Sequence, residues 1–143
     1  MKELIGKKID KVYVSEGEHL LKFVSGADEL IYYAEGDCCS ESWFADISGV
    51  DCLFGATVSA VEEMEYIDAQ EVDNITRQEF DLIYGIKLYT NKGIADIVFR
   101  NSSNGYYGGW CNILWNKEWE TKLVSESKFV EITDDWLAGD FKQ

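Results

Sequence analysis

The sequence of 143 residues has no proline, a single histidine and only two arginines, and 27 acidic side chains outnumber its 13 lysines and arginines. The formal net charge at pH 7 is therefore −14. Proteins that bind phosphate groups need clusters of lysine and arginine, so this composition excludes non-specific binding to DNA, RNA and anionic membranes. No segment approaches the roughly 18 apolar residues of a membrane span, and no signal peptide is evident. We therefore expect a cytoplasmic protein.

Residues that could carry chemistry are also sparse. The cysteines at positions 38, 39, 52 and 111 lack the short paired spacing of structural zinc ligands. A cysteine nucleophile needs a base, and the only histidine, His19, falls in a different segment. Phosphate-binding and calcium-binding loop motifs are missing. The sequence predicts no catalytic residues, no metal site and no cofactor, and it favours a non-enzymatic function.

The sequence does contain material for a core, since 46% of its residues are apolar and 14% are aromatic. A chain of this length can bury most of that surface in one domain, which we assign to residues 1–143. Alternating apolar residues between turn residues predict about seven strands, including a hairpin of residues 82–90 and 94–100. The expected fold class is α+β, a mainly antiparallel β-sheet with one or two short helices.

Two further assignments concern the middle and the end of the chain. Trp43, Phe44 and Ile47 have the spacing of a helix, and they predict a helix over residues 40–50. The segment 121–132 is rich enough in β-forming residues to predict a strand.

Two stretches of the sequence resemble each other. Residues 5–12 and 54–61 share the pattern apolar-Gly-x-x-(Ile or Val)-x-x-Val, and matching strands follow each of them. The offset between the copies widens from 49 to 65 residues, which indicates an acidic insertion at about 65–81. Two interpretations stay open. Units 4–44 and 53–112 are an internal duplication, or they are unrelated three-strand units that look alike by chance.

If the two units are related, Glu35 and Arg100 end equivalent strands and carry opposite charge. We therefore predict an ion pair between them near a pseudo-twofold axis. In each unit a polar, glycine-containing loop follows and leads to a tryptophan, Trp43 or Trp110.

Acidic residues are concentrated in and beside the insertion, and they suggest a surface for a basic partner. The candidate partner-binding residues are Glu62, Glu65, Asp68, Glu71, Asp73 and Glu79. The alternative is that these carboxylates form an ordinary solvated face. Under the first interpretation the partner is a protein with a basic surface, because carboxylates can imitate the phosphates of nucleic acid.

A second candidate site is the segment 101–109, which is rich in asparagine, serine, glycine and tyrosine. Such a segment can hold a small polar ligand, for example a nucleotide signal, by stacking and hydrogen bonds. The candidate ligand-binding residues are Arg77, Arg100, Asn101, Asn104, Tyr106 and Trp110. The alternative is a long hairpin loop whose aromatic side chains cover the core.

Two motifs, EGDCCSESWF at residues 35–44 and FRNSSNGYYGGW at residues 99–110, resemble a family of small uncharacterised proteins. The resemblance covers about residues 4–112. That family is a domain of unknown function found in bacteriophages, prophages and their mainly Gram-positive hosts. The resemblance implies the cytoplasm of a bacterial host cell and the role of a phage accessory protein. Combined with the charge, it suggests a non-enzymatic protein that inhibits a host defence or nucleic-acid-binding protein.

Overall fold

The computed structural model describes residues 1–36, 40–68, 80–103, 109–114 and 118–138. Its strands are β1 (Lys11–Ser15), β2 (Leu20–Ser25), β3 (Asp28–Gly36), β4 (Ser40–Ser48), β5 (Val58–Asp68), β6 (Phe80–Thr90), β7 (Gly93–Ser103), β8 (Gly109–Ile113), β9 (Phe129–Ile132) and β10 (Trp136–Leu137). The described helices are η1 (Lys2–Leu4), η2 (Val50–Cys52) and α1 (Glu118–Glu126). None of these helices has the length and apolar character needed to cross a membrane.

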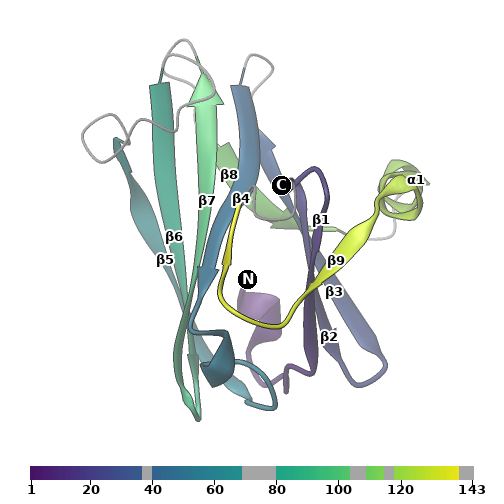
Figure 1. The fold of residues 1–143 in the computed structure, drawn as a ribbon, viewed down its shortest axis with the longest axis vertical. Coiled ribbons are helices and arrows are strands. Elements are labelled where there is room, and N and C mark those ends of the chain that lie inside the picture. Colours follow the sequence, from purple (N-terminus) through teal and green to yellow (C-terminus); the bar gives the residue numbers. More distant parts are fainter. Residues whose placement is uncertain (37–39, 69–79, 104–108, 115–117, 139–143) are drawn as a thin grey trace.

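The strands form two antiparallel sheets packed face to face (Figure 1). The order is β8-β3-β2-β1-β9 in the first sheet and β10-β4-β7-β6-β5 in the second. The predicted antiparallel β architecture is confirmed, and so is the hairpin at the turn before Gly93, which joins β6 and β7. The described residues hold ten strands rather than about seven, and their few helical residues make the α+β label only loosely fitting.

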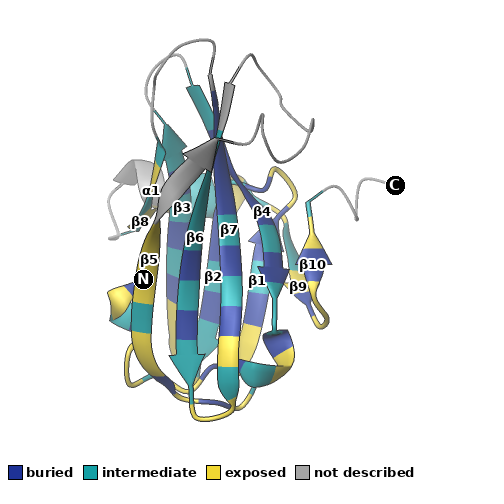
Figure 2. Cartoon of the chain, turned by 90° about the vertical axis from the view of Figure 1, so that its left-hand side faces the viewer, coloured by how far each residue is buried: buried dark blue, intermediate teal, exposed yellow. Residues whose placement is uncertain are grey.

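The core lies between the two sheets, and the strands that face it bury alternate residues. On β3, Leu30, Tyr32 and Ala34 are buried while their neighbours are partly exposed, and on β7 Ile97 and Phe99 follow the same alternation. Figure 2 shows the resulting bands of burial along β6 and β7. This pattern is the two-residue period of a strand with one face in the core.

The helix predicted over residues 40–50 is wrong, because residues 40–48 form strand β4. The cause is a β-bulge, an extra residue in one strand, between Phe44 and Asp46. The bulge places Phe44 and Ile47 on the same face, so their spacing of three residues imitates a helix. The strand predicted over 121–132 is correct only at its end, since α1 extends to Glu126 and β9 begins at Phe129.

The two sheets are built alike around their contact at residues 6–9 and 55–58. The Gly6 N–H donates to the carbonyl of Val58 at 2.8 Å, and the Gly55 N–H donates to the carbonyl of Ile9 at 2.7 Å. Equivalent residues are 49 positions apart, so the two bonds are related by a twofold rotation. Both glycines have positive φ, 87° and 71°, which a residue with a side chain rarely adopts.

The same relation continues through the strands. Phe23 pairs with Leu30 between β2 and β3, and Leu88 pairs with Ala95 between β6 and β7, at an offset of 65 residues. Each three-strand unit is then extended by the strand that follows the other unit, since β8 pairs with β3 and β4 pairs with β7. Two copies of one unit would exchange their following strands in this symmetric way. The duplication itself stays a prediction.

The two lateral sides of the sandwich differ. On one side, β9 pairs with β1 and β10 pairs with β4, so residues 129–137 pass from the first sheet to the second (Figure 1). We call this the closed side. On the other, the open side, the sheets end at β8 and β5, and no described strand pairs with their outer edges. Figure 2 shows β5 as a largely exposed edge.

A carboxyl group on the closed side makes stability depend on pH. Burial raises the pKa of Asp46 above its ordinary value of 3.8, and the carboxylates of Asp135 and Asp96 add to the effect. The folded state therefore binds this proton more tightly than the unfolded state, and stability falls as the pH rises above 3.8 through the raised pKa. At neutral pH the whole penalty is present.

We therefore expect Asp46→Asn to raise the free energy of unfolding at neutral pH by up to about 1 kcal/mol, since water screens a partly exposed carboxyl. Below about pH 3, where the wild-type carboxyl is protonated in both states, the gain should vanish. Urea unfolding of both proteins at the two pH values measures the difference. An equal gain at both would contradict the assignment.

Candidate functional site

A buried polar cluster lies where β3, β4, β7 and β8 converge. Asn101, which is fully buried, donates from Nδ2 to Ser40 Oγ at 3.0 Å and to Ser42 Oγ at 2.9 Å. Gly36 and Gly109 pair with each other across β3 and β8 against these side chains. A Cβ atom on either glycine would approach a serine Oγ more closely than real Cβ atoms do. Both positions therefore require glycine.

This cluster explains why the two motifs of the sequence contain serine, asparagine and glycine at these positions. Residues 35–44 and 99–110 lie far apart in the sequence, yet their described parts meet in one interior site. From the sequence, residues 101–109 are predicted as a loop and residues 40–50 as a helix, so the cluster was missed. The signal that could have revealed it is the glycine beside small polar residues in each motif.

Next to the cluster, on the open side, is a cleft of about 360 Å³, which we call the β5–β8 cleft. It is lined by Glu63, Met64, Tyr84, Gly85, Ile86, Phe99, Gly109, Trp110, Cys111 and Asn112. The rings of Tyr84 and Phe99 stack with centroids 4.7 Å apart, and the Gly109 N–H donates to the Tyr84 hydroxyl at 3.1 Å. Met64 and Trp110 are exposed by 48% and 41%, so the cleft offers apolar surface to a ligand.

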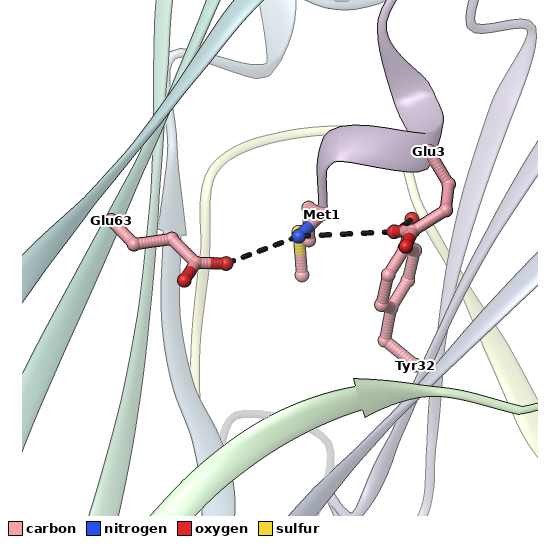
Figure 3. Close-up of polar contacts among 4 residues, drawn as sticks. All are labelled: Met1, Glu3, Tyr32 and Glu63. Carbon is pink, nitrogen blue, oxygen red and sulfur yellow. Dashed lines mark hydrogen bonds and ion pairs between the residues drawn. The ribbon is translucent and has the colours of Figure 1, made fainter.

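The wall of the cleft formed by β5 is joined to the first sheet through a charged group. The buried amino group of Met1 lies 3.1 Å from Glu63 Oε1 and 4.0 Å from Glu3 Oε1. The Tyr32 hydroxyl donates to Glu3 Oε1 at 3.0 Å. Figure 3 shows the amino group between the two carboxylates. The cation thus holds Glu63, which lines the cleft, beside the N-terminal segment.

Burial, followed by the effect of Glu3, raises the pKa of the Tyr32 hydroxyl. Burial also raises the pKa of the Cys111 thiol to about 12, and the neighbouring carboxylates of Glu63 and Glu3 add to this effect. At neutral pH the Cys111 thiol is therefore protonated, and only the thiolate is a nucleophile. The cleft supplies apolar contacts and hydrogen bonds rather than a reactive cysteine.

A further carboxylate lies at the rim of the cleft. Glu35 on β3 accepts a hydrogen bond from Trp110 Nε1 at 2.9 Å and another from Asn112 Nδ2. These bonds hold the indole and the amide of the edge strand β8 in place. The rim therefore combines an exposed aromatic ring with a negative charge.

The structure does not bring the described candidate ligand-binding residues to one surface. Asn101 belongs to the interior cluster, and Trp110 lies at the rim of the cleft. Arg100 is mostly buried, with 9% exposure, and points to the other face of β7 because neighbouring residues of a strand alternate. The remaining candidates, Arg77, Asn104 and Tyr106, lie outside the described residues.

The predicted ion pair between Glu35 and Arg100 gains no support from this geometry. Glu35 lies opposite Trp110 on the first sheet, and Arg100 lies opposite Trp43 on the second. Both alternate with residues that face the core, so their side chains point away from it on different sheets.

The candidate partner-binding residues lie along β5 and beyond it. Glu62 is exposed and accepts a hydrogen bond from the Tyr89 hydroxyl at 3.1 Å. Glu65 and Asp68 belong to β5, and their side chains are not among those described. Glu71, Asp73 and Glu79 fall outside the described residues. Sequence reasoning passed over Glu63, which lines the cleft and belongs to the same run of acids.

Comparison with known proteins adds relatives of unknown function. A family model described as a domain of unknown function (DUF7448) matches residues 2–113. An uncharacterized protein of Acanthamoeba polyphaga mimivirus is 32% identical over 110 residues, which cover 74% of this chain and 86% of that protein. No solved structure matches the chain. The family match ends at the last residue of β8. Residues 129–137, which carry β9 and β10 and which we call the closing segment, lie beyond it.

Proposed function

Because the chain belongs to the DUF7448 family of domains of unknown function, we propose its function from its own geometry: a non-enzymatic binding protein. Its ligand is a basic surface on a protein partner. The observation that carries the proposal is the exposed edge strand β5, on which Glu63 and exposed Met64 line an apolar cleft and the neighbouring Glu62 is also exposed. Acidic side chains around an apolar contact are what a basic partner surface would fit.

The formal net charge of −14 supports the same proposal, since it attracts cationic surfaces and repels nucleic acid. We propose that the chain is a phage or prophage accessory protein. Its target is a host defence protein or another nucleic-acid-binding protein, whose phosphate-binding surface is basic. The relative from a mimivirus supports a viral origin in general and not a bacterial host in particular.

The test is binding to a panel of purified bacterial nucleases and DNA-binding defence proteins, measured by biolayer interferometry. We expect at least one panel member to bind and its affinity to fall about tenfold or more between about 50 and about 500 mM salt, because salt screens contacts between exposed charges. A triple variant, Glu62→Lys, Asp73→Lys and Glu79→Lys, should lose affinity by a similar factor.

The matched control is Glu16→Lys, Asp51→Lys and Asp134→Lys, which changes net charge equally at exposed positions elsewhere. It should bind nearly as well as the wild type. Equal losses in both triple variants would show a general charge effect without a defined surface. Binding that persists unchanged at high salt, or no binding to any panel member, would contradict the proposal.

The second candidate function is capture of a small polar ligand, and the volume of the β5–β8 cleft favours it. The described lining residues include Glu63 and no lysine or arginine, so this part of the cleft suits a neutral or cationic ligand better than a nucleotide. Thermal unfolding with a panel of nucleotides and of polyamines separates the two classes. No change in melting temperature with any compound would eliminate this candidate.

A further inference from the structure

The two sides of the sandwich are equivalent under the internal twofold relation, yet only one is covered by a further part of the chain. On the closed side, β9 adds to the edge of β1 and β10 adds to the edge of β4. The equivalent edges on the open side belong to β5 and β8, and no described strand pairs with them. On the closed side, therefore, one extended stretch of chain pairs with both edge strands.

Equivalent residues confirm that the two sides differ in how fully they are packed. Phe44 pairs with Phe99 on the closed side, and the equivalent pair on the open side is Cys111 with Ala34. Phe44 is fully buried, whereas the smaller Cys111 borders the cleft. A phenylalanine on one side is thus matched on the other by a smaller cysteine beside a cleft.

The tryptophans show the same contrast. Trp43 on β4 is 3% exposed, and its equivalent on β8, Trp110, is 41% exposed. Trp136 of the closing segment is itself 8% exposed and belongs to the core. The closed side therefore has a core aromatic side chain supplied by the added segment, and no described residue supplies an equivalent one on the open side.

We propose that the open side binds an extended peptide segment of the partner protein, which adds as a strand to β5 or β8. This inference rests on the proposed function and names the structure that the partner presents. An edge strand offers unpaired backbone N–H and C=O groups, and strand addition satisfies them. A large apolar side chain of the segment enters the β5–β8 cleft over Tyr84 and Phe99.

The negative charge of the open side favours basic residues in the peptide segment that binds there. Glu63 lines the cleft on β5, and Glu35 accepts a hydrogen bond from Trp110 at its rim. Among the residues that the structure describes, none of those lining the cleft has a cationic side chain. The segment therefore carries at least one lysine or arginine near its apolar anchor. A cation held close to an exposed indole ring also gains a favourable interaction with its face.

The probe is a displayed library of random twelve-residue peptides selected on the wild-type protein. We expect enriched peptides with one large apolar residue and at least one lysine or arginine, and about tenfold weaker binding to Met64→Arg. The matched control is Ile94→Arg, since Ile94 is 44% exposed at the distant β6–β7 turn, and it should bind normally. Methylating alternate backbone nitrogens of an enriched peptide should also weaken binding about tenfold, because each methyl group removes a donor.

The outcomes separate this inference from the proposed function. A panel protein that binds in a salt-dependent manner and tolerates both Met64→Arg and Trp110→Ala would leave the proposed function standing and overturn strand addition. The inference also fails if no peptide is enriched, or if enriched peptides bind Met64→Arg as well as the wild type. A dimer of the chain that Met64→Arg dissociates would identify a second copy as the occupant and overturn it too.

Discussion

Replacing Phe44 with alanine is expected to lower the free energy of unfolding by about 3–5 kcal/mol. Phe44 is fully buried between the sheets, and its ring meets that of Phe99 edge to face with centroids 6.4 Å apart. Its neighbours on β4 are held by β7 on one edge and by β10 on the other. Since the strands cannot close over the gap, most of the lost contact would remain as a cavity. Urea unfolding followed by circular dichroism measures the loss.

The matched control is Cys111→Ala, which truncates the equivalent residue on the open side. Cys111 already borders a cleft, so its removal creates little new cavity, and we expect a loss of about 1 kcal/mol or less. Similar losses in the two variants would contradict the claim that the closed side is fully packed and the open side is not.

A methyl group at Gly109 is expected to cost about 2–3 kcal/mol, because it overpacks the interior polar cluster. The added Cβ would collide with Ser42 Oγ and lie 2.9 Å from Asn101 Cβ. Either β4 and β7 must move away from β8, or the hydrogen bonds of Asn101 must break. The unfolding free energy of Gly109→Ala measures the effect. Adding Ser42→Ala removes one collision, so the double variant should be about 1 kcal/mol more stable than the sum of the single losses.

Gly85→Ala is the control, since Gly85 also lies within a strand but has room for a Cβ atom. Its nearest atoms would be 3.8 Å from an added Cβ, an ordinary contact distance. Alanine there should be neutral or stabilising by up to about 1 kcal/mol, because it restricts the unfolded chain. If Gly109→Ala proved as stable as Gly85→Ala, the interior cluster would not be the reason for glycine in the motif.

The sequence predicted those parts of the fold that depend on neighbouring residues. The hairpin of β6 and β7 followed from strand-like patterns around a turn, and the repeated glycine patterns marked the equivalent contacts of Gly6 and Gly55. The helix over residues 40–50 failed because a one-residue bulge in a strand produces helical spacing. That bulge is set by pairing with β7, which lies more than forty residues away.

For the candidate site, too, some features were predicted from the sequence and others depended on the pairing of distant strands. The concentration of acids along residues 62–81 predicted an acidic surface, and within the described residues Glu62 and Glu63 on β5 are exposed. The grouping of Arg100, Asn101 and Trp110 into one ligand set came from their closeness in sequence. The pleat of β7 turns Arg100 and Asn101 to opposite faces, and β8 carries Trp110 to the edge of the other sheet.

By itself the sequence determined the net charge and the antiparallel β character. These properties follow from side-chain chemistry and from the two-residue period of a strand. Only the tertiary structure decided that strands β4 and β8 are exchanged between the units and that residues 129–137 close one side. Such pairings join distant segments through backbone hydrogen bonds, which any residue except proline can make. The local sequence therefore gives little indication of which strands pair. The cleft between β5 and β8 is a consequence of these pairings.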